Sequence, residues 1–100
     1  MFTVIYRWRV KPELEQQFVE SWSAITEHYL KNFEGARGSR LHRGSDGIWY
    51  AYAQWQSDEY RQKAFQNRPD LLARAKLLEA IEENFPEIRL EIAADFLQAD

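Results

Sequence analysis

Two histidines, His28 and His42, are the side chains of this sequence with an ordinary pKa near neutral pH. His42 alternates with Arg40 in a segment that reads as a strand, so both side chains are expected on one face. If that face borders a cavity, His42 can take a proton from a phenol; the alternative is an exposed histidine on an edge strand. His28 lies beside Tyr29 and off the apolar stripe of a predicted helix, so we expect it to be solvated.

Tyrosine and arginine side chains supply further polar groups that could hold an aromatic substrate. Tyr50 and Tyr52 lie two residues apart in a predicted strand, so their rings could stack on a flat molecule or hydrogen-bond its oxygen. Arg7 and Arg9 share one face of another predicted strand, where a guanidinium could hold a phenolate or superoxide-like anion. The alternatives are plain packing for the tyrosines, and for the arginines pairing with Glu91 or with a carboxylate of a partner chain.

These residues define a predicted site for an aromatic small molecule. We expect catalytic roles for His42, Tyr52 and Arg7, and substrate-binding roles for Arg9, Arg40, Tyr50 and Trp8. The chain has no cysteine, no cluster of histidines or carboxylates at metal-ligand spacing and no glycine-rich phosphate loop, so neither a metal nor a cofactor is predicted. The substrate itself would then have to be electron-rich to carry redox chemistry.

Length and composition limit the class of protein. A chain of 100 residues suits one domain, so we expect residues 1–100 to form a single unit. Apolar residues make up 45% and charged residues 29%, which is typical of a globular protein. The net charge is −3 without any basic run, which argues against a nucleic-acid partner. No stretch approaches about 18 apolar residues and the first residues do not resemble a signal peptide, so we expect no membrane span and a cytoplasmic location.

Hydrophobic periodicity predicts the elements that position these side chains in the first half of the chain. Alternation over residues 2–10 predicts a strand. A stripe at spacings of three and four predicts a helix over residues 13–33, and Gly35 is expected to follow its end. Residues 37–43 and 47–55 read as a hairpin around an Asp-Gly turn. The helical stripe consists of Leu14, Phe18, Trp22, Ile25, Tyr29 and Phe33.

The second half is predicted to hold a broken helix and a last strand. Ser57 is expected to cap a helix that Asn67-Arg68-Pro69 interrupts. Pro69 then starts a second segment from about residue 70 to 84, and Pro86 stops it. A strand follows over residues 88–93 and continues to about residue 97. The apolar side of the second segment is expected to carry Leu71, Ala75, Leu78, Ile81 and Phe85.

The order β-α-β-β-α-β predicts an α+β, ferredoxin-like fold: a four-stranded antiparallel sheet with the helices on one face. Apolar content assigns the covered face to Val4, Tyr6, Trp8, Ala51, Ala53, Trp55, Leu90 and Ile92. The open face is then expected to carry Ile5, Arg7, Arg9, Tyr50, Tyr52, Arg89 and Glu91. In the alternative with swapped faces, Tyr6 and Trp8 line the open side.

The sheet face without helices needs a cover. Both faces hold large aromatic side chains, which are costly to expose to water. Pairing two sheets face to face across a two-fold axis would remove that cost, so we predict a homodimer. The pairing would enclose a cavity lined by Arg, Tyr and His side chains, which is a typical small-molecule site.

Three parts of the chain resemble a known family. They are Ile5–Pro12 with Phe18 and Trp22 of the following helix, then Gly38–Arg43, and then Tyr50–Ser57. On these segments the chain resembles the antibiotic biosynthesis monooxygenase domain family, within the dimeric α/β-barrel superfamily. The resemblance covers residues 1 to about 65 well and the rest by the order of elements.

The resemblance implies a homodimer with a barrel-like interior. Some relatives oxidise polycyclic phenols or quinols with dioxygen and no cofactor. Others degrade haem, using an Asn on the first strand and a His in the second helical region. Residues 2–10 contain no Asn and residues 57–85 contain no His, so haem is not expected here.

Two functions follow as alternatives. The first is a cofactor-independent monooxygenase for a phenolic, quinol or polycyclic aromatic substrate, held between the helices and the sheet or between the two sheets of a dimer. In it, His42 or a tyrosine removes a phenolic proton, and the substrate anion, steadied by Arg7 or Arg40, gives an electron to dioxygen in a dry cavity. The second is a non-catalytic small-molecule-binding or stress-related dimer that uses the same cavity.

Overall fold

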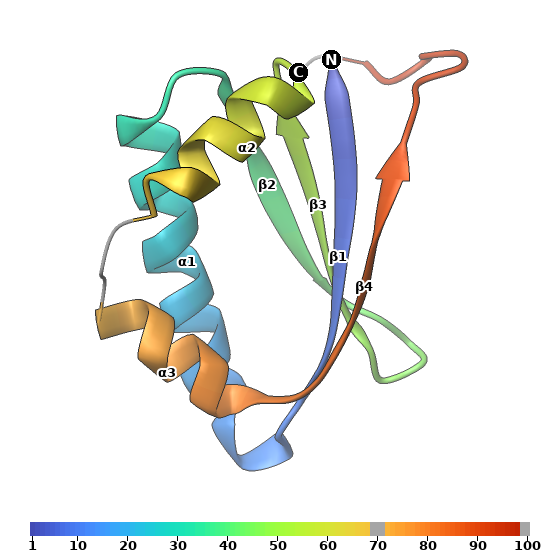
Figure 1. The fold of residues 1–100 in the computed structure, drawn as a ribbon. Coiled ribbons are helices and arrows are strands. Elements are labelled where there is room, and N and C mark those ends of the chain that lie inside the picture. Colours follow the sequence, from blue (N-terminus) through green and yellow to red (C-terminus); the bar gives the residue numbers. More distant parts are fainter. Residues whose placement is uncertain (69–71, 99–100) are drawn as a thin grey trace.

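The computed structural model describes residues 1–68 and 72–98. Its elements are β1 (Phe2–Val10), the short 3-10 helix η1 (Pro12–Leu14), α1 (Glu15–Asn32), β2 (Ala36–Arg43), β3 (Trp49–Trp55), α2 (Asp58–Gln66), α3 (Leu72–Ala80) and β4 (Ile81–Leu90). The strands form one antiparallel sheet in the order β2-β3-β1-β4, and the helices all lie on one side of it (Figure 1). The predicted ferredoxin-like fold is confirmed.

Strand β1 and helix α1 form the centre of the core. Alternation along β1 buries Val4, Trp8 and Val10 on the helix side of the sheet. Phe18, in the predicted stripe of α1, is fully buried, and its ring lies edge-on to Trp8 and Trp49 at centroid distances of 5.3 and 5.4 Å. Within the described part of the chain, no helix combines the length and apolar content that crossing a membrane requires.

The turn between α1 and β2 depends on Gly35. Its φ of 86° lies in the left-handed region that favours glycine. A Cβ atom at this position would lie 2.5 Å from the ring of Tyr60 on α2. The missing side chain therefore lets α2 pack close to the turn that follows α1.

The β2–β3 hairpin and the start of α2 form as predicted. The Gly44 N–H donates to the Ile48 carbonyl at 2.7 Å, and the Ile48 N–H donates to the Asp46 carboxylate at 2.9 Å. The Ser57 hydroxyl accepts a hydrogen bond from the Tyr60 N–H at 3.3 Å and so caps the first turn of α2. These local bonds close the turn and begin the helix at the residues whose types predicted them.

The end of α3 differs from the prediction. A helix that continues to residue 84 and is stopped by Pro86 is wrong, because α3 ends at Ala80 and β4 begins at once. The Lys11 N–H donates to the Ala80 carbonyl at 2.9 Å, and residues 81–85 then pair with β1. Pairing with a central strand outweighs the helix propensity of this segment.

Helix α3 also turns another side to the core than predicted. Ala80 is buried and Leu77 packs against the core cluster, whereas Ala75 and Leu78 are exposed. The predicted apolar side of α3 and the side that faces the core therefore differ by one residue position along the helix. Two residues that were assigned to the start and the apolar side of this segment lie outside the described residues: Pro69 and Leu71.

Strand β4 contains a bulge at Pro86. Ile5 pairs with Ile88 and Arg7 pairs with Phe85, so β4 has one more residue than β1 over this stretch. Proline has no N–H to donate, and an edge strand with a bulge tolerates it. The predicted strand over residues 88–97 is therefore wrong in its bounds: pairing starts before the proline and ends at Leu90.

The sheet faces follow the prediction in β1 and β3 but not in β4. Leu90 pairs with Thr3 and lies on the open face, whereas it was expected on the covered one. Arg89 pairs with Val4 on the helix side, where its guanidinium lies 3.8 Å from Asp58 of α2. Apolar content misled the assignment because Arg89, although on the helix side, keeps its side chain 60% exposed and pairs with Asp58 and Glu87. Two further residues with predicted faces lie beyond the end of β4: Glu91 and Ile92.

Candidate functional site

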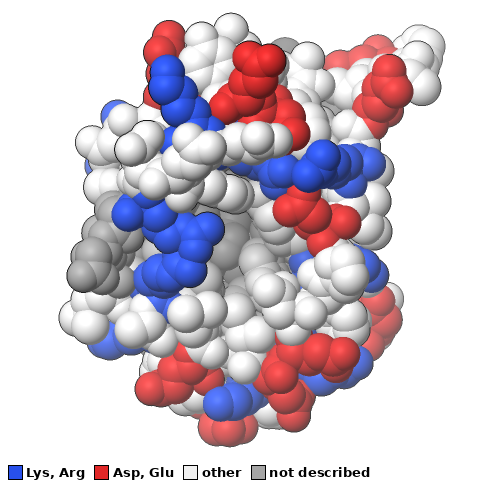
Figure 2. Space-filling model, viewed as in Figure 1, with Lys and Arg blue, Asp and Glu red and all other residues white. Residues whose placement is uncertain are grey.

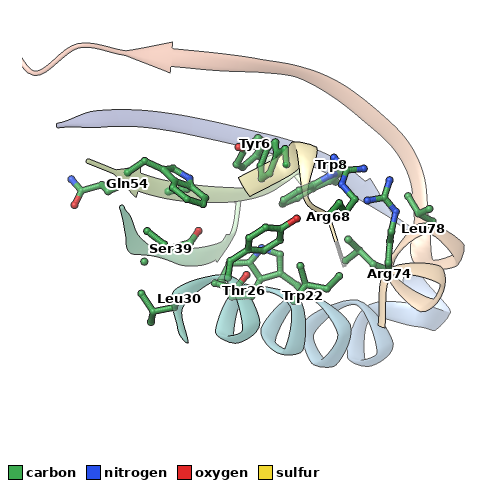
Figure 3. Close-up of a pocket in the computed structure, with 18 of the residues that line it drawn as sticks. Tyr6, Trp8, Trp22, Thr26, Leu30, Ser39, Gln54, Arg68, Arg74 and Leu78 are labelled. Carbon is green, nitrogen blue, oxygen red and sulfur yellow. The ribbon is translucent and has the colours of Figure 1, made fainter. Parts of the chain in front are cut away.

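A cavity of about 280 Å³ lies between the sheet and the helices (Figure 3). Strands β1, β2 and β3 contribute one side of it, and α1 and α3 contribute the other. Its volume is near the lower end of the range for small-molecule pockets, roughly 300 Å³. The lining includes Tyr6, Trp8, Trp22, Thr26, Ser39 and Asn84.

Small residues on the strands create this space. Ala36, Gly38 and Ala53 line the cavity from β2 and β3. Each has a methyl group or no side chain at all, so the sheet cannot fill the volume beneath α1. The cavity therefore follows from the side-chain sizes of the strands.

The remaining lining is mostly apolar, and about a third of it is aromatic. The rings of Tyr6 and Trp8 are stacked at a centroid distance of 6.1 Å and an interplanar angle of 23°. Tyr29 lies edge-on to Trp55 at 6.3 Å and to Phe65 at 5.6 Å. Flat apolar surfaces of this kind suit an aromatic ligand that can stack on them or meet their edges.

Polar groups lie at the two ends of the cavity. Figure 3 shows Arg68 and Arg74 at the end near Trp8 and Ser39 at the other. The Gln54 side chain points away from the cavity and donates to the Tyr52 hydroxyl on the open face at 3.0 Å. Among the described residues that line the cavity, none is a histidine, an aspartate or a glutamate. The described lining thus holds cations and neutral groups but no ordinary general base.

Behind Tyr6 lies a buried arginine, Arg61 of α2, of which only 4% is exposed. Its Nε lies 2.9 Å from the Asp58 carboxylate, and its Nη1 lies 3.0 Å from Glu87. Nη1 also donates a hydrogen bond to the Tyr6 hydroxyl oxygen at 3.1 Å. Arg61 therefore ties α2 to β1 and β4 and fixes the tyrosine ring that lines the cavity.

The ionisation states around Arg61 follow from these contacts. Burial raises the pKa of Tyr6, and the hydrogen bond from Arg61 only partly offsets this. The hydrogen bond from Arg61 lowers the pKa of Glu87. Burial opposes ionisation of Asp58, but hydrogen bonds from Arg61 and Gln62 outweigh it and lower the pKa of that carboxyl. At neutral pH Tyr6 is therefore a neutral phenol beside a charged, paired arginine.

The sheet face away from the helices carries six of the seven predicted site residues: Arg7, Arg9, Arg40, His42, Tyr50 and Tyr52. Tyr50 pairs with Arg7 on one side and with His42 on the other. The seventh, Trp8, points to the opposite side and lines the cavity. Strand alternation thus placed the six side chains together correctly, but the sheet separates them from Trp8.

The two arginines of β1 have partners on this open face. The Arg7 Nη2 donates to the Pro86 carbonyl oxygen at 2.9 Å. The Arg9 Nε lies 3.6 Å from the carboxylate of Glu83, rather than from the predicted Glu91. Because β4 begins at residue 81, a carboxylate that had been assigned to a helix lies opposite Arg9.

Other residues of the cavity carried little signal in the sequence. Trp22 and Tyr29 belong to the predicted stripe of α1 and were assigned to the core alone. Thr26 lies on the same side of that helix and lines the cavity with them. Arg68 and Arg74 have no periodic pattern, and only the predicted helix break next to Arg68 marked that region.

The sequence profile of the antibiotic biosynthesis monooxygenase family matches residues 1–77. Among solved structures, Rv0793 from Mycobacterium tuberculosis superposes with a TM-score of 0.73 at 17% identity, over 96% of this chain and 98% of that one. A conserved protein from Methanosarcina mazei Go1 gives 0.73 at 17% identity, over 89% of each chain. PA3566 from Pseudomonas aeruginosa gives 0.71 at 18% identity, over 93% and 94%. At these identities the likeness to solved structures shows the fold alone. None of the curated proteins matches the chain.

Proposed function

Because the chain belongs to the antibiotic biosynthesis monooxygenase family, we propose that it is a cofactor-independent monooxygenase for an electron-rich phenolic, quinol or polycyclic aromatic compound. The observation that carries the proposal is the cavity of about 280 Å³ between the helices and the sheet, with its aromatic lining. Trp8, Trp22 and Tyr29 would hold a flat ring system there and exclude water from its reacting carbon.

In the proposed reaction the substrate supplies the electrons. Loss of a proton from the methylene carbon of an anthrone-like substrate, or from the hydroxyl of a quinol, gives an anion, which passes one electron to dioxygen. The resulting radical and superoxide combine to a peroxide anion. This anion takes up a proton from water to become a hydroperoxide, and loss of water then leaves a carbonyl group. For a methylene carbon the balance is one dioxygen consumed, one carbonyl formed and one water released. Because the described lining has no histidine or carboxylate, the proton would leave through the open mouth of the cavity to water.

The open sheet face offers a second proposed place for the same chemistry. If two chains pair through it, His42 could act as the base, and Tyr52, Arg7 and Arg40 could bind the anion in the space between the sheets. Support for this alternative comes from the shared face of these side chains. A comparison of variants on the two faces separates the two places.

Oxygen uptake with a panel of hydroquinones and anthrones tests the proposal. We expect the wild-type chain to consume one dioxygen for each anthrone carbonyl formed. Thr26→Phe, which fills the cavity from α1, is expected to lower the rate by at least about tenfold, since a ligand that cannot seat loses its orientation. His42→Ala and Tyr52→Phe serve as the matched pair for the open face and are expected to stay within about twofold.

The opposite pattern, with uptake lost in His42→Ala and kept in Thr26→Phe, would move the site to the open face. Uptake that is absent for every substrate would support the second candidate function, a non-catalytic small-molecule-binding dimer. The lack of a histidine or carboxylate in the described lining favours that candidate, because the lining binds an aromatic ring without supplying a base.

We also propose that the chain is a homodimer that pairs through the open face. Support comes from apolar side chains on that face, among them Ile88 at 40% exposure.

Sedimentation equilibrium is expected to give a mass near twice the 12.0 kDa of one chain. Ile88→Asp should shift the mass toward that of a monomer, because a charge would be buried in the interface. Val19→Asp, at a site of α1 with a similar exposure of 38%, should not. A wild-type monomer, or equal effects of the two variants, would contradict this interface.

A further inference from the structure

Two arginines from different segments meet at one end of the cavity. Arg68 follows the end of α2, and Arg74 lies in α3. Both line the cavity, and Figure 3 shows both at the end that Trp8 borders. Figure 2 shows basic side chains gathered beside the hollow between the helices and the sheet. The cationic end is therefore part of the cavity wall and is accessible from its mouth.

These two guanidinium groups differ from Arg61 in their partners. Arg61 has two carboxylates within 4.0 Å. Within residues 1–68 and 72–98, no carboxylate lies within 4.0 Å of Arg68 or Arg74. Arg68 instead lies over the ring of Phe65, with its Cζ 5.6 Å from the centroid. Two positive charges beside an apolar space repel each other, and an anion that binds between them offsets this repulsion.

The opposite end of the cavity has different chemistry. Ser39 is neutral, and its hydroxyl already donates to the Tyr52 carbonyl at 3.1 Å. The aromatic residues lie between this neutral end and the arginines. The cavity thus distinguishes the two ends of an elongated ligand, and its cationic end fits the anionic oxygens of a carboxylate, a sulfonate or a phenolate.

We propose that the ligand of this cavity is an acidic aromatic compound, with its ring system against Trp8 and Trp22 and its anionic group between Arg68 and Arg74. The proposal rests on the proposed use of this cavity as the substrate site and narrows its substrate class. Because the whole chain has a net charge of −3, long-range attraction would not bring an anion here, and the two local arginines must provide the selectivity.

Two fluorescent probes of nearly the same shape test the inference. 1-Anilinonaphthalene-8-sulfonate carries an anionic group, and N-phenyl-1-naphthylamine is the same ring system without it. In fluorescence titrations, Arg74→Gln and Arg68→Gln are each expected to weaken binding of the sulfonate by about tenfold, because a charge-assisted contact is lost. Binding of the neutral probe should stay within about twofold. Arg37→Gln, an exposed arginine of β2 outside the cavity lining, should change neither.

The results separate failure of the anionic-ligand proposal from failure of the proposed binding site. If Arg68→Gln and Arg74→Gln weaken the binding of both probes equally, or of neither, the proposal of an anionic ligand is wrong. The arginines would then not distinguish the charged probe from the neutral one. Thr26→Phe should block both probes in every case. If it leaves the neutral probe bound, the cavity is not the binding site, and the proposed function fails with it. Circular dichroism of each variant establishes that the fold is retained.

Discussion

Replacing Arg61 with Leu is expected to lower the free energy of unfolding by about 3–5 kcal/mol, the range for removing one partner of a buried ion pair. The side chain is almost fully buried, and it pairs with Asp58 and Glu87 from two different elements. Leucine fills part of the volume but removes the Arg61 contacts of both carboxylates and of the Tyr6 hydroxyl, leaving Asp58 with Gln62 and Glu87 with Arg89 as remaining donors. Urea unfolding of the two proteins, followed by tryptophan fluorescence, measures the difference.

Acidification gives an independent check of this effect. Arg61 lowers the pKa of Glu87 and contributes to the lowered pKa of Asp58, so the stability from these contacts is present above the unfolded pKa values, about 4. It is lost as the pH falls through the lower folded values. The difference between wild type and Arg61→Leu should therefore be largest near neutral pH and shrink toward pH 3. Lys31→Met, which removes the exposed ion pair with Glu27, is the control and should change little at any pH. A deficit that does not depend on pH would mean that lost packing, rather than lost pairing, causes it.

Replacing Phe18 with Ala is expected to cost about 3–5 kcal/mol, the range for truncating a buried phenylalanine. Its ring has no exposed surface and lies edge-on between Trp8 and Trp49, so the substitution leaves a void between α1 and the sheet. The neighbouring Val19→Ala, on the exposed side of the same helix, should cost less than about 1 kcal/mol. Similar losses from Phe18→Ala and Val19→Ala in chemical denaturation would show that the centre of the core lies elsewhere.

Local patterns predicted the first two thirds of the fold and failed near its end. The stripe of α1, the Asp-Gly turn and the Ser57 cap depend on neighbours in sequence, and each formed at the expected residues. Residues 81–85 also have helix-compatible types, but they pair with β1, more than seventy positions earlier in the chain. A pattern read from neighbouring residues cannot predict pairing between segments so far apart in the sequence. The faces of Arg89 and Leu90, predicted from apolar content, are reversed in the structure because the pairing of β4 with β1 sets them.

The candidate site was predicted in part. Alternation correctly placed Arg7, His42 and Tyr50 on one face, because the period of a strand is set by its geometry. Alternation could not predict the cavity on the other face. That space arises because small strand residues such as Ala53 lie opposite the apolar stripe of α1, and the stripe itself has the pattern of a core helix. Nor could spacing bring Arg74 to the same cavity as Trp8, which requires the packing of α3 against α1.

The two outer strands of the sheet are poor templates for adding a further strand. The bulge in β4 contains Pro86, which lacks an N–H, so an incoming chain could not form a continuous hydrogen-bonded ladder along that side. At the other side, β2 has three arginines in eight residues, Arg37, Arg40 and Arg43, and two copies of it would repel each other. Growth into fibres by strand addition is therefore opposed at both edges, which helps an aromatic-rich chain of this size to resist aggregation at high concentration.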